Sequence, residues 1–303
     1  MSMLRQLETP DILDISLKRT CREIDGLLDE LLTPPGDARD RLYLAIRHAA
    51  IGGGKRMRPL LVLASADLFD VTHASALRTG LAVECIHVHS LIHDDLPCMD
   101  DDDTRRGKPT VHKAFDEATA VLAGDALHAL AFEILADPST HSDGAVRSAL
   151  VRDLAAAAGA AGMAGGQMLD LLPEAITDLE GVVRLQRLKT GALISWCVEA
   201  GATLGRAPDT ARINLRGYGQ CVGLAFQIAD DLLDFEGNEE AVGKRLRKDE
   251  AAGKVSFVSL LGPERARSQA RALVDQAKDH LRPLGKDVSL LRSIADYALA
   301  RDR

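Results

Sequence analysis

Six aspartates lie within ten residues in the first third of the chain, in the stretch HDDLPCMDDDD. Asp94 and Asp95 come directly after a segment rich in Leu, Val and Ile, and Asp100 opens the four-residue acidic run that follows. Acidic runs are also typical of solvated loops. Two carboxylates about 4 Å apart, however, repel each other by roughly 4 kcal/mol at an effective dielectric constant near 20, so acids beside a core helix need cations. Oxygen ligands at this density favour Mg²⁺, which commonly bridges carboxylates to substrate phosphates.

A second acidic set occurs in the stretch FQIADDLLD. Its polar residues follow the spacing i, i+3, i+4, i+7, which places them on one face of a helix: Gln227, Asp230, Asp231 and Asp234. Apolar residues occupy another face of that helix. A single motif of this kind also occurs on exposed helices without any function. Two such motifs, each ending a largely apolar helix, indicate two metal-binding sets that face each other.

Basic residues near these motifs indicate an anionic substrate. Lys55, Arg56 and Arg58 follow Gly52–Gly54 and precede a predicted helix near Pro59, where backbone N–H groups and the helix dipole favour phosphate. An ordinary helix-linking turn is the alternative, and a Walker loop is excluded because Arg56 replaces the required Ser or Thr. Further cations follow in the chain: Arg105, Arg106, Lys189 with Thr190 at a predicted helix start, and Lys244, Lys248 and Lys254 in a charge-dense loop over residues 236–254.

Three histidines, His87, His89 and His93, precede the first acidic motif. His89 and His93 have the i, i+4 spacing of zinc ligands, but zinc sites of this kind usually add a third soft ligand and a Glu base. His87 lies two helical turns before Asp94 on the same face, so a hydrogen bond to bound phosphate is the preferred interpretation.

The elements that must position these residues are predicted to be helices. Ala and Leu supply 89 of the 303 residues, and both lose little side-chain freedom in a helix. Turn residues divide the chain into helix-sized blocks, and no alternating strand pattern is found. We therefore predict an all-α bundle. The predicted blocks include residues 77–95, 114–136, 145–172, 178–204, 209–235, 264–281 and 288–301.

Composition excludes several other classes of protein. The formal charge of −8 argues against a nucleic-acid surface, which needs net positive charge. Five cysteines without paired spacing favour a reduced, cytoplasmic protein. No signal peptide is expected, and no uncharged apolar stretch is long enough to predict a membrane span. A Ca²⁺-binding module is disfavoured because the chain lacks a D-x-D-x-D-G loop.

The motifs together closely resemble those of the trans-type isoprenyl diphosphate synthases, and specifically the bacterial farnesyl and geranylgeranyl diphosphate synthases. The matching segments are GGGKRMRP, SLIHDDLPCMDDDDTRRGKPTVHKAF, GGQMLDL, LKTGAL, FQIADDLLD and GKRLRKDEAAGK. The resemblance implies one domain over residues 1–303, a helical bundle around a central cavity, and a homodimer. Length alone favours two domains, and the resemblance replaces that expectation.

The resemblance also implies the roles of the site residues. Three Mg²⁺ ions, with Mn²⁺ as the alternative ion, would be held by Asp94, Asp100, Asp230 and Asp234, with Asp95 and Asp231 nearby. The allylic diphosphate would be gripped by Arg105, Lys189, Thr190, Gln227, Lys244 and Lys254. Isopentenyl diphosphate would lie against Lys55, Arg58, His87 and Arg106. The implied catalytic set is Asp94, Asp95, Asp100, Asp230, Asp231 and Lys189.

Product length is implied by two residues on the helix that precedes the first motif. In the family, the residues four and five positions before the motif set the depth of the cavity; here they are Ser90 and His89. The ring of His89 favours a C15 product, farnesyl diphosphate, with a C20 geranylgeranyl product as the alternative. A non-catalytic regulatory partner of a prenyl synthase is disfavoured because both Asp motifs are intact. A terpene cyclase of the same fold is disfavoured because cyclases lack GGGKR and Arg105–Arg106.

Overall fold

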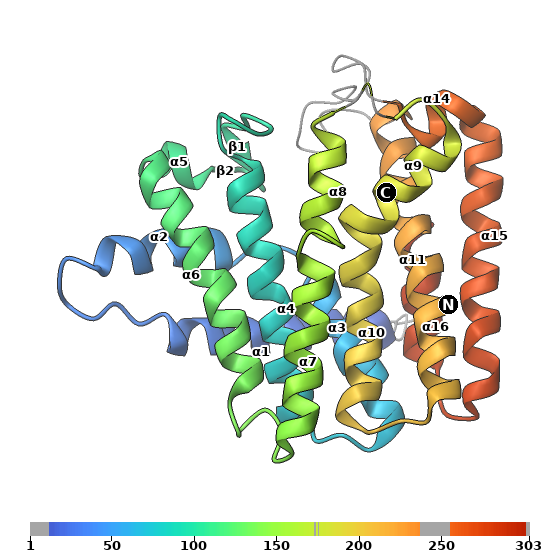
Figure 1. Cartoon of the computed structure of the whole chain (residues 1–303), viewed down its shortest axis with the longest axis horizontal. Helices are drawn as coiled ribbons and strands as arrows, with labels where there is room; N and C mark the ends of the chain where they lie inside the picture. Colours follow the sequence, from blue (N-terminus) through green and yellow to red (C-terminus); the bar gives the residue numbers. More distant parts are fainter. Residues whose placement is uncertain (1–11, 173, 175, 237–254, 301–303) are drawn as a thin grey trace, which may run out of the picture.

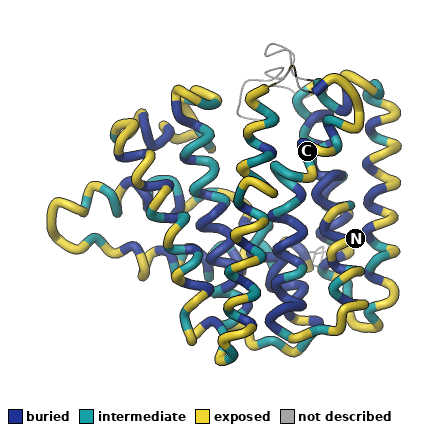
Figure 2. Tube along the Cα trace, in the orientation of Figure 1, coloured by how far each residue is buried: buried dark blue, intermediate teal, exposed yellow. Residues whose placement is uncertain are grey.

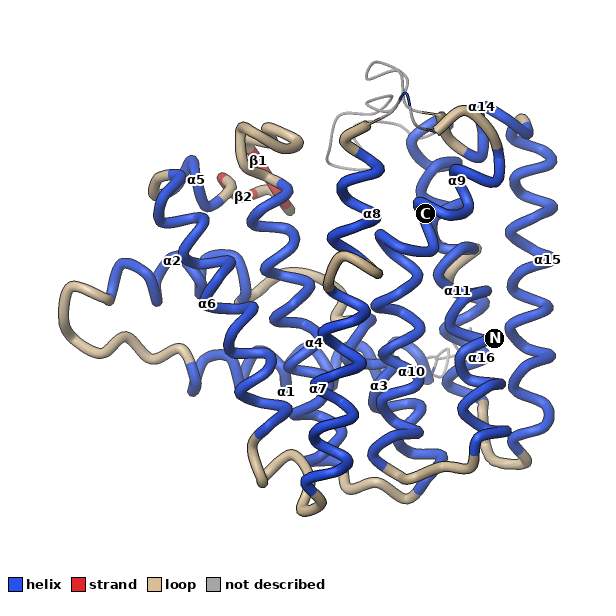
Figure 3. Tube along the Cα trace, in the orientation of Figure 1, coloured by secondary structure: helices blue, strands red, loops and turns tan. Residues whose placement is uncertain are grey.

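The computed structural model describes residues 12–172, 174, 176–236 and 255–300, and within these ranges the chain is almost entirely helical (Figures 1 and 3). The α-helices in chain order are α1 Ile12–Leu31, α2 Asp40–Ala50, α3 Met57–Ala66, α4 His73–Asp94, α5 Val111–Ala114, α6 Glu117–Ala136, α7 Gly144–Ala158, α8 Met163–Asp170, α9 Leu179–Gln186, α10 Ala192–Leu204, α11 Asp209–Glu236, α14 Phe257–Leu261, α15 Pro263–Leu281 and α16 Ser289–Tyr297. The predicted all-α bundle is confirmed.

Short elements complete the described fold. Single turns of tighter or wider helix are η1 Asp67–Phe69, η3 Arg187–Gly191 and η4 Arg282–Leu284. The two strands that the sequence did not predict are β1 Thr104–Arg105 and β2 Lys108–Pro109, which pair antiparallel in a hairpin. Each strand is two residues long, too short for the alternating pattern by which strands are recognised in a sequence.

Two helices form the centre of the bundle. α10 is buried along almost its whole length, and α3 is buried from Pro59 to Ala66 (Figure 2). The two helices approach closely at Gly201, where an added Cβ atom would lie 2.2 Å from the Ser65 Oγ atom. α4 packs against α3 and α6, and α11 packs against α10 and α15. The helices that carry the two Asp motifs are therefore both packed onto this core.

Polar side chains fix where several helices begin. The Thr72 side chain accepts a hydrogen bond from the backbone N–H of Ser75 at the start of α4, and the Asp116 side chain accepts one from Thr119 at the start of α6. Such caps satisfy backbone N–H groups that have no partner within the helix. The start of α4 in turn fixes where its carboxyl end places Asp94.

One described helix, α6, is long and apolar enough to cross a membrane by length and composition. No membrane span was predicted there from the sequence, because Asp125 and Glu133 interrupt the apolar residues of α6. In the bundle α6 packs against α4, α2 and α7, and the core helix of a bundle has the same composition as a membrane span.

Candidate active site

The two Asp motifs lie at the same end of the bundle. α4 and α11 both end at the top of Figure 1, at the edge where α8 and α14 also lie. Asp94 is the last residue of α4, and Asp230, Asp231 and Asp234 occupy the last turns of α11. The motifs come from distant parts of the sequence, and the packing of both helices onto α10 brings them to one edge.

Asp94 has an unusual electrostatic environment. Burial raises the pKa of its carboxyl to about 6, the positive charge of Lys189 acts against that rise, and the negative charge of Asp100 adds to it. A buried carboxylate favours its neutral form because ionisation in a low-dielectric setting is costly. Asp94 therefore holds a proton more tightly than an exposed aspartate, and a divalent cation would stabilise the ionised form in its place.

Asp95, the second acid of the motif, is buried and paired with Arg105. The Arg105 Nη2 atom lies 2.6 Å from the Asp95 Oδ1 atom, and the Arg105 Nε–H donates to the same oxygen over 2.7 Å. Burial raises the pKa of Asp95, whereas the hydrogen bond from Arg105 lowers it. Arg105 belongs to β1, so this ion pair fixes the hairpin against the end of α4.

Lys189 lies between the two motifs, on a wide helical turn. Lys189 and Thr190 were predicted to lie at the start of a helix, and this prediction is wrong. They lie inside one continuous helix formed by α9, η3 and α10, in which η3 is a π-helical turn. Single π turns insert an extra residue and often occur at functional sites. The insertion re-aims Lys189, whose Nζ atom lies 2.8 Å from the Asp170 Oδ2 atom at the end of α8.

Gly166 is the residue of α8 that permits this arrangement. A Cβ atom added at Gly166 would lie 2.2 Å from the backbone nitrogen of Lys189. We expect Gly166→Ala to push α8 away from η3 and to lower the free energy of unfolding by about 1–3 kcal/mol. Turnover should fall with it, because Lys189 moves. Gly26→Ala in α1, where an added Cβ would meet nothing within 4 Å, is the matched control for urea denaturation and should not destabilise.

Gln227 connects Thr190, the residue after Lys189, to the second motif. The Thr190 hydroxyl donates to the Gln227 Oε1 atom over 3.3 Å, and the Gln227 Nε2 atom donates to the Asp231 Oδ1 atom over 3.1 Å. The other oxygen of Asp231 accepts the backbone N–H of Phe257, at the start of α14, over 3.0 Å. Asp231 is buried, and these bonds give it a positioning role that the sequence did not indicate. Asp230 and Asp234 are half-buried on the same helix.

The predicted cationic side is assembled around His87. Burial lowers the pKa of His87 well below its usual value, and the charges of Arg58, Arg106 and Arg105 lower it further. The Arg106 guanidinium lies over the glycine loop, where a Cβ added at Gly54 would meet its Nη2 atom at 2.7 Å. Arg58, His87 and Arg106 are thus close in space. Arg106 can lie over the loop because the glycines there have no side chains.

Lys55 lies at the edge of this group and contacts the last described helix. Its ammonium lies 5.0 Å from the ring centroid of Tyr297 in α16 and donates a hydrogen bond to the Tyr297 hydroxyl. This contact could not be predicted from the sequence, because 242 residues separate the two partners. The remaining predicted cations, Lys244, Lys248 and Lys254, lie outside the described residues.

Two further residues contribute to the site in ways that the sequence did not predict: Asp170 was not among the candidate residues, and Arg56 has a different role. Asp170, the partner of Lys189, is the one acid in the motif GGQMLDL, and an acid in an otherwise apolar helix was the available signal. Arg56, counted among the candidate phosphate ligands, is instead 2% exposed and forms ion pairs of 2.6 Å with both Asp25 and Glu84. Its backbone has a left-handed conformation, with φ of 50°. Arg56 holds the glycine loop in place and does not face the site.

His89 and Ser90 lie one turn below the first motif. The His89 ring packs against the rings of His93, at 4.6 Å between centroids, and His128 of α6, at 5.0 Å. Burial lowers the pKa of His89 to about 4, assisted by the two neighbouring histidines, so the ring is uncharged at neutral pH. Ser90 donates to the backbone carbonyl of His87 over 2.9 Å.

This fold and this arrangement of side chains define a class of protein: an α-helical bundle of the isoprenoid synthase type, with two Asp motifs at one end and a cationic group beside the first. A family model described as polyprenyl synthetase matches residues 39–289. The chain belongs to the polyprenyl synthetase family, which confirms the family resemblance found in the sequence.

Individual relatives cover nearly the whole chain. It is 42% identical to the farnesyl diphosphate synthase of Escherichia coli strain K12, over 95% of this chain and 98% of that one. A solved structure of an FPP/GFPP synthase from Zymomonas mobilis is 54% identical, with a TM-score of 0.87, and covers 95% of this chain and 98% of its own. A Helicobacter pylori geranyltransferase, solved with magnesium and isoprenyl diphosphate, is 33% identical, with a TM-score of 0.82, over 98% and 99% of the chains.

Proposed function

We propose that this chain is a short-chain prenyltransferase that condenses isopentenyl diphosphate with dimethylallyl and geranyl diphosphates to give farnesyl diphosphate. Membership of the polyprenyl synthetase family supports the reaction class. The observation that carries the proposal is the position of Lys189, whose charge acts on Asp94 of the first motif while its neighbour Thr190 bonds to Gln227 beside the second. A diphosphate placed there would meet acids from both motifs.

The acidic side chains fit divalent cations by their chemistry. All the donors in the two motifs are oxygens. Burial raises the pKa of Asp94 to about 6, so a bound cation would stabilise its ionised form. Asp94, Asp100, Asp230 and Asp234 would hold three Mg²⁺ ions, with Mn²⁺ as the alternative. When bound, the ions neutralise the charge that develops on the diphosphate leaving group. The solved relative from Helicobacter pylori contains magnesium.

The cations of the chain orient the two substrates. Lys189, Thr190 and Gln227, with Arg105, Lys244 and Lys254, would grip the allylic diphosphate. Arg105 is already bonded to Asp95, and its planar guanidinium retains other N–H donors for a second anion. Lys55, Arg58, His87 and Arg106 would hold isopentenyl diphosphate on the other side. The low pKa of His87 follows from burial beside several cations and would rise once an anion binds among them.

The reaction needs no side-chain nucleophile. The allylic C–O bond breaks, diphosphate leaves with the electron pair, and the double bond of isopentenyl diphosphate attacks the allylic cation. Loss of one proton to the released diphosphate completes a product one C5 unit longer. The apolar residues of α4 and α6 exclude water from the cation, which would otherwise be quenched.

Incubation of the protein with isopentenyl diphosphate, dimethylallyl diphosphate and Mg²⁺ tests the proposal directly. Chromatography of the dephosphorylated products should show farnesol as the main alcohol. A C20 alcohol would favour the geranylgeranyl alternative, and no product with any allylic substrate would favour a non-catalytic regulatory partner. The Zymomonas mobilis relative is described as a synthase of two products, FPP and GFPP, so family membership alone does not determine the length of the product.

His89→Ala is expected to lengthen the product. The His89 ring fills space beside α6 one turn below the Asp motif, and its removal opens that space to a longer prenyl chain. Product alcohols from a fixed incubation should shift from C15 towards C20. Glu133→Ala, at an exposed position of α6, is the control and should leave the distribution unchanged. An unaltered product from His89→Ala would assign length control to another residue.

The assembly and domain structure belong to the same proposal. One continuous hydrophobic core includes residues from Leu13 to Ala298, which supports a single domain over residues 1–303. Val121 and Leu122 on α6 are 41% and 56% exposed, and such apolar residues support a homodimer contact on that helix. The free cysteines support a reducing, cytoplasmic location.

A further inference from the structure

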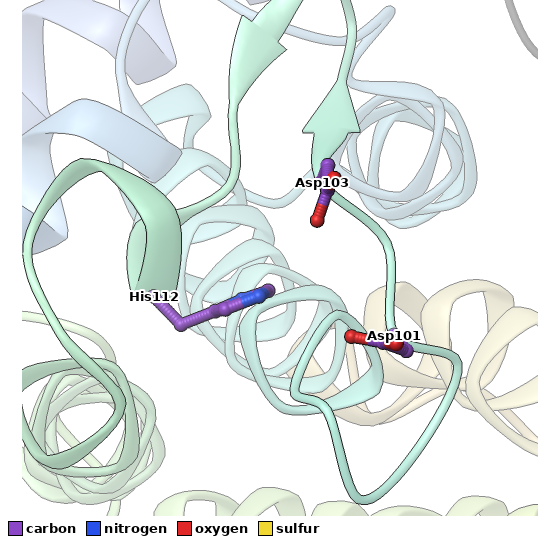
Figure 4. A group of neighbouring side chains, drawn as sticks. All are labelled: Asp101, Asp103 and His112. Carbon is purple, nitrogen blue, oxygen red and sulfur yellow. The ribbon is translucent and has the colours of Figure 1, made fainter.

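A second group of potential metal ligands lies on the side of the β-hairpin, outside the residues assigned to Mg²⁺. It consists of Asp101, Asp103 and His112, whose donor atoms all lie within 4.8 Å of one another. Asp101 follows Asp100 in the loop after α4, Asp103 immediately precedes β1, and His112 lies in α5. The imidazole of His112 points into the space between the two carboxylates (Figure 4).

His112 is the unusual member of this group. Its side chain is buried, with 8% of the residue exposed, and its Nε2 atom has no hydrogen-bond partner among the described residues. Buried polar atoms without a partner are rare in native proteins, and each needs an explanation. Here the atom faces two acids.

Thr110 determines which nitrogen of His112 carries the proton. The Thr110 hydroxyl donates its one proton to the backbone carbonyl of Asp102 over 2.8 Å. The same oxygen lies 3.2 Å from the His112 Nδ1 atom, and it can only accept there, so Nδ1 carries the N–H. In that tautomer the Nε2 atom offers its lone pair, and Nε2 faces the two carboxylates. A hydrogen bond that fixes the other ring nitrogen in this way is typical of histidines that bind metal.

We propose that Asp101, Asp103 and His112 form a site for a divalent transition-metal ion such as Zn²⁺, Mn²⁺ or Co²⁺, separate from the Mg²⁺ sites of the two Asp motifs. One imidazole nitrogen and two carboxylate oxygens suit such ions, which accept nitrogen ligands, whereas Mg²⁺ prefers oxygen alone. Water would complete the coordination. The ion would bind the Nε2 lone pair and the two acids, in competition with the charge of Lys113 at Asp103.

The site would hold the two ends of the hairpin together. Asp103 precedes β1 and His112 follows β2, and the backbone N–H of Thr110 already donates to the carbonyl of Asp103 over 3.0 Å. The hairpin carries Arg105, which pairs with Asp95, and Arg106. An ion at its base would therefore restrict the two arginines that lie beside the first motif.

Lys113 provides a variant with the opposite expected effect. Its Nζ atom lies 2.8 Å from the Asp103 Oδ1 atom, and its side chain is 44% exposed. A metal ion at Asp103 must compete with this charge. Lys113→Gln should therefore tighten metal binding, whereas His112→Gln and Asp103→Asn should weaken it.

Titration with Co²⁺ in excess Mg²⁺ tests the proposal on the full-length protein. The excess Mg²⁺ occupies the oxygen sites, and visible absorption of Co²⁺ reports a nitrogen ligand. We expect one further Co²⁺ ion per chain in the wild type and at least about tenfold weaker binding in His112→Gln and Asp103→Asn. Co²⁺ should raise the Tm of the wild type and of Lys113→Gln, but not that of His112→Gln or Asp103→Asn. Circular dichroism of each variant establishes that it is folded.

Asp94→Asn is the control that separates this site from the proposed catalytic one. It removes an expected Mg²⁺ ligand and should leave the additional Co²⁺ ion in place, whether or not the protein proves to be a prenyltransferase. Absence of additional Co²⁺ in the wild type would overturn the proposal. Equal binding by the folded Asp103→Asn and His112→Gln variants, or loss of the ion in Asp94→Asn, would also overturn it.

Discussion

Asp94→Asn is expected to lower turnover by about a thousandfold or more while it stabilises the metal-free protein. The loss of activity follows from the loss of a metal ligand, because a bound ion contributes several kcal/mol of transition-state stabilisation. The gain in stability follows from burial, which raises the pKa of Asp94 to about 6, so the folded protein bears a cost when this carboxyl ionises. Function and stability therefore oppose each other at this residue.

The pH dependence gives the stability effect its sign. Burial raises the pKa of Asp94 in the folded protein from the ordinary aspartate value of 3.8 to about 6. Between these values the folded state binds more protons than the unfolded state, so this group's contribution to stability falls as the pH rises. The full cost, about 3 kcal/mol at 1.36 kcal/mol per unit, is present above pH 6.

Urea denaturation of the metal-free proteins at several pH values checks this expectation. Asp94→Asn should be more stable than the wild type by up to about 3 kcal/mol at pH 7.5, and the difference should disappear near pH 4. Saturating Mg²⁺ should recover stability in the wild type alone. The exposed Asp275→Asn in α15 is the control for activity. Near-normal turnover in Asp94→Asn would remove Asp94 from the metal site.

The helices themselves could be predicted from the sequence because their apolar residues recur with a helical period. The predicted block 77–95 is α4, His73–Asp94, with its carboxyl end placed within one residue. The blocks 145–172 and 178–204 each contained a feature that periodicity does not reveal. The first is broken between α7 and α8, and the second contains the π turn η3, which depends on the contact of Gly166 with Lys189 across two helices.

The candidate site was predictable where its residues are neighbours in the sequence and less so where they are not. The acids of each motif, and Arg105 with Arg106, could be found because carboxylates and cations at those spacings have few structural uses. The pairing of Arg56 with Glu84 could not, since 28 residues separate them and only the packing of α3 against α4 brings them together. Arg56 could be grouped from the sequence with Lys55 and Arg58 as a cation beside the glycine loop, although the family resemblance did not imply it as a ligand. That its charge is already compensated is visible only in the structure.

Glu84→Ala is expected to have the largest effect on stability of the substitutions considered. Glu84 is 2% exposed on α4 and accepts a hydrogen bond from the buried Arg56 guanidinium over 2.6 Å. Its removal leaves Arg56 with only Asp25 and a backbone carbonyl as partners, in an environment where an uncompensated charge is costly. Breaking one partner from a buried ion pair typically costs about 3–5 kcal/mol, and we expect a loss of that size.

Chemical denaturation with a matched exposed pair measures the effect of burial. Asp279→Ala removes one partner of the ion pair with Arg282, whose side chain is 72% exposed, and should change the free energy of unfolding by less than about 1 kcal/mol. Equal effects of the two substitutions would show that the buried Arg56–Glu84 pair contributes no more to the free energy of unfolding than the exposed Asp279–Arg282 pair. The double variant Arg56→Met with Glu84→Leu removes both buried charges and should recover part of the loss. The other partner of Arg56, Asp25, has a side chain that is 29% exposed and can be hydrated.

Arg56 also donates a hydrogen bond to the backbone carbonyl of Ala50, so Glu84→Ala should also disturb the cationic residues of the site. Arg56 is adjacent to Lys55, and the glycine loop before them lies against Arg106. A displaced Arg56 would release this loop, so Glu84→Ala should raise the KM for isopentenyl diphosphate more than that for the allylic substrate. An equal rise in both constants would indicate general loss of structure, whereas a selective rise would show that this buried ion pair positions one substrate's binding loop.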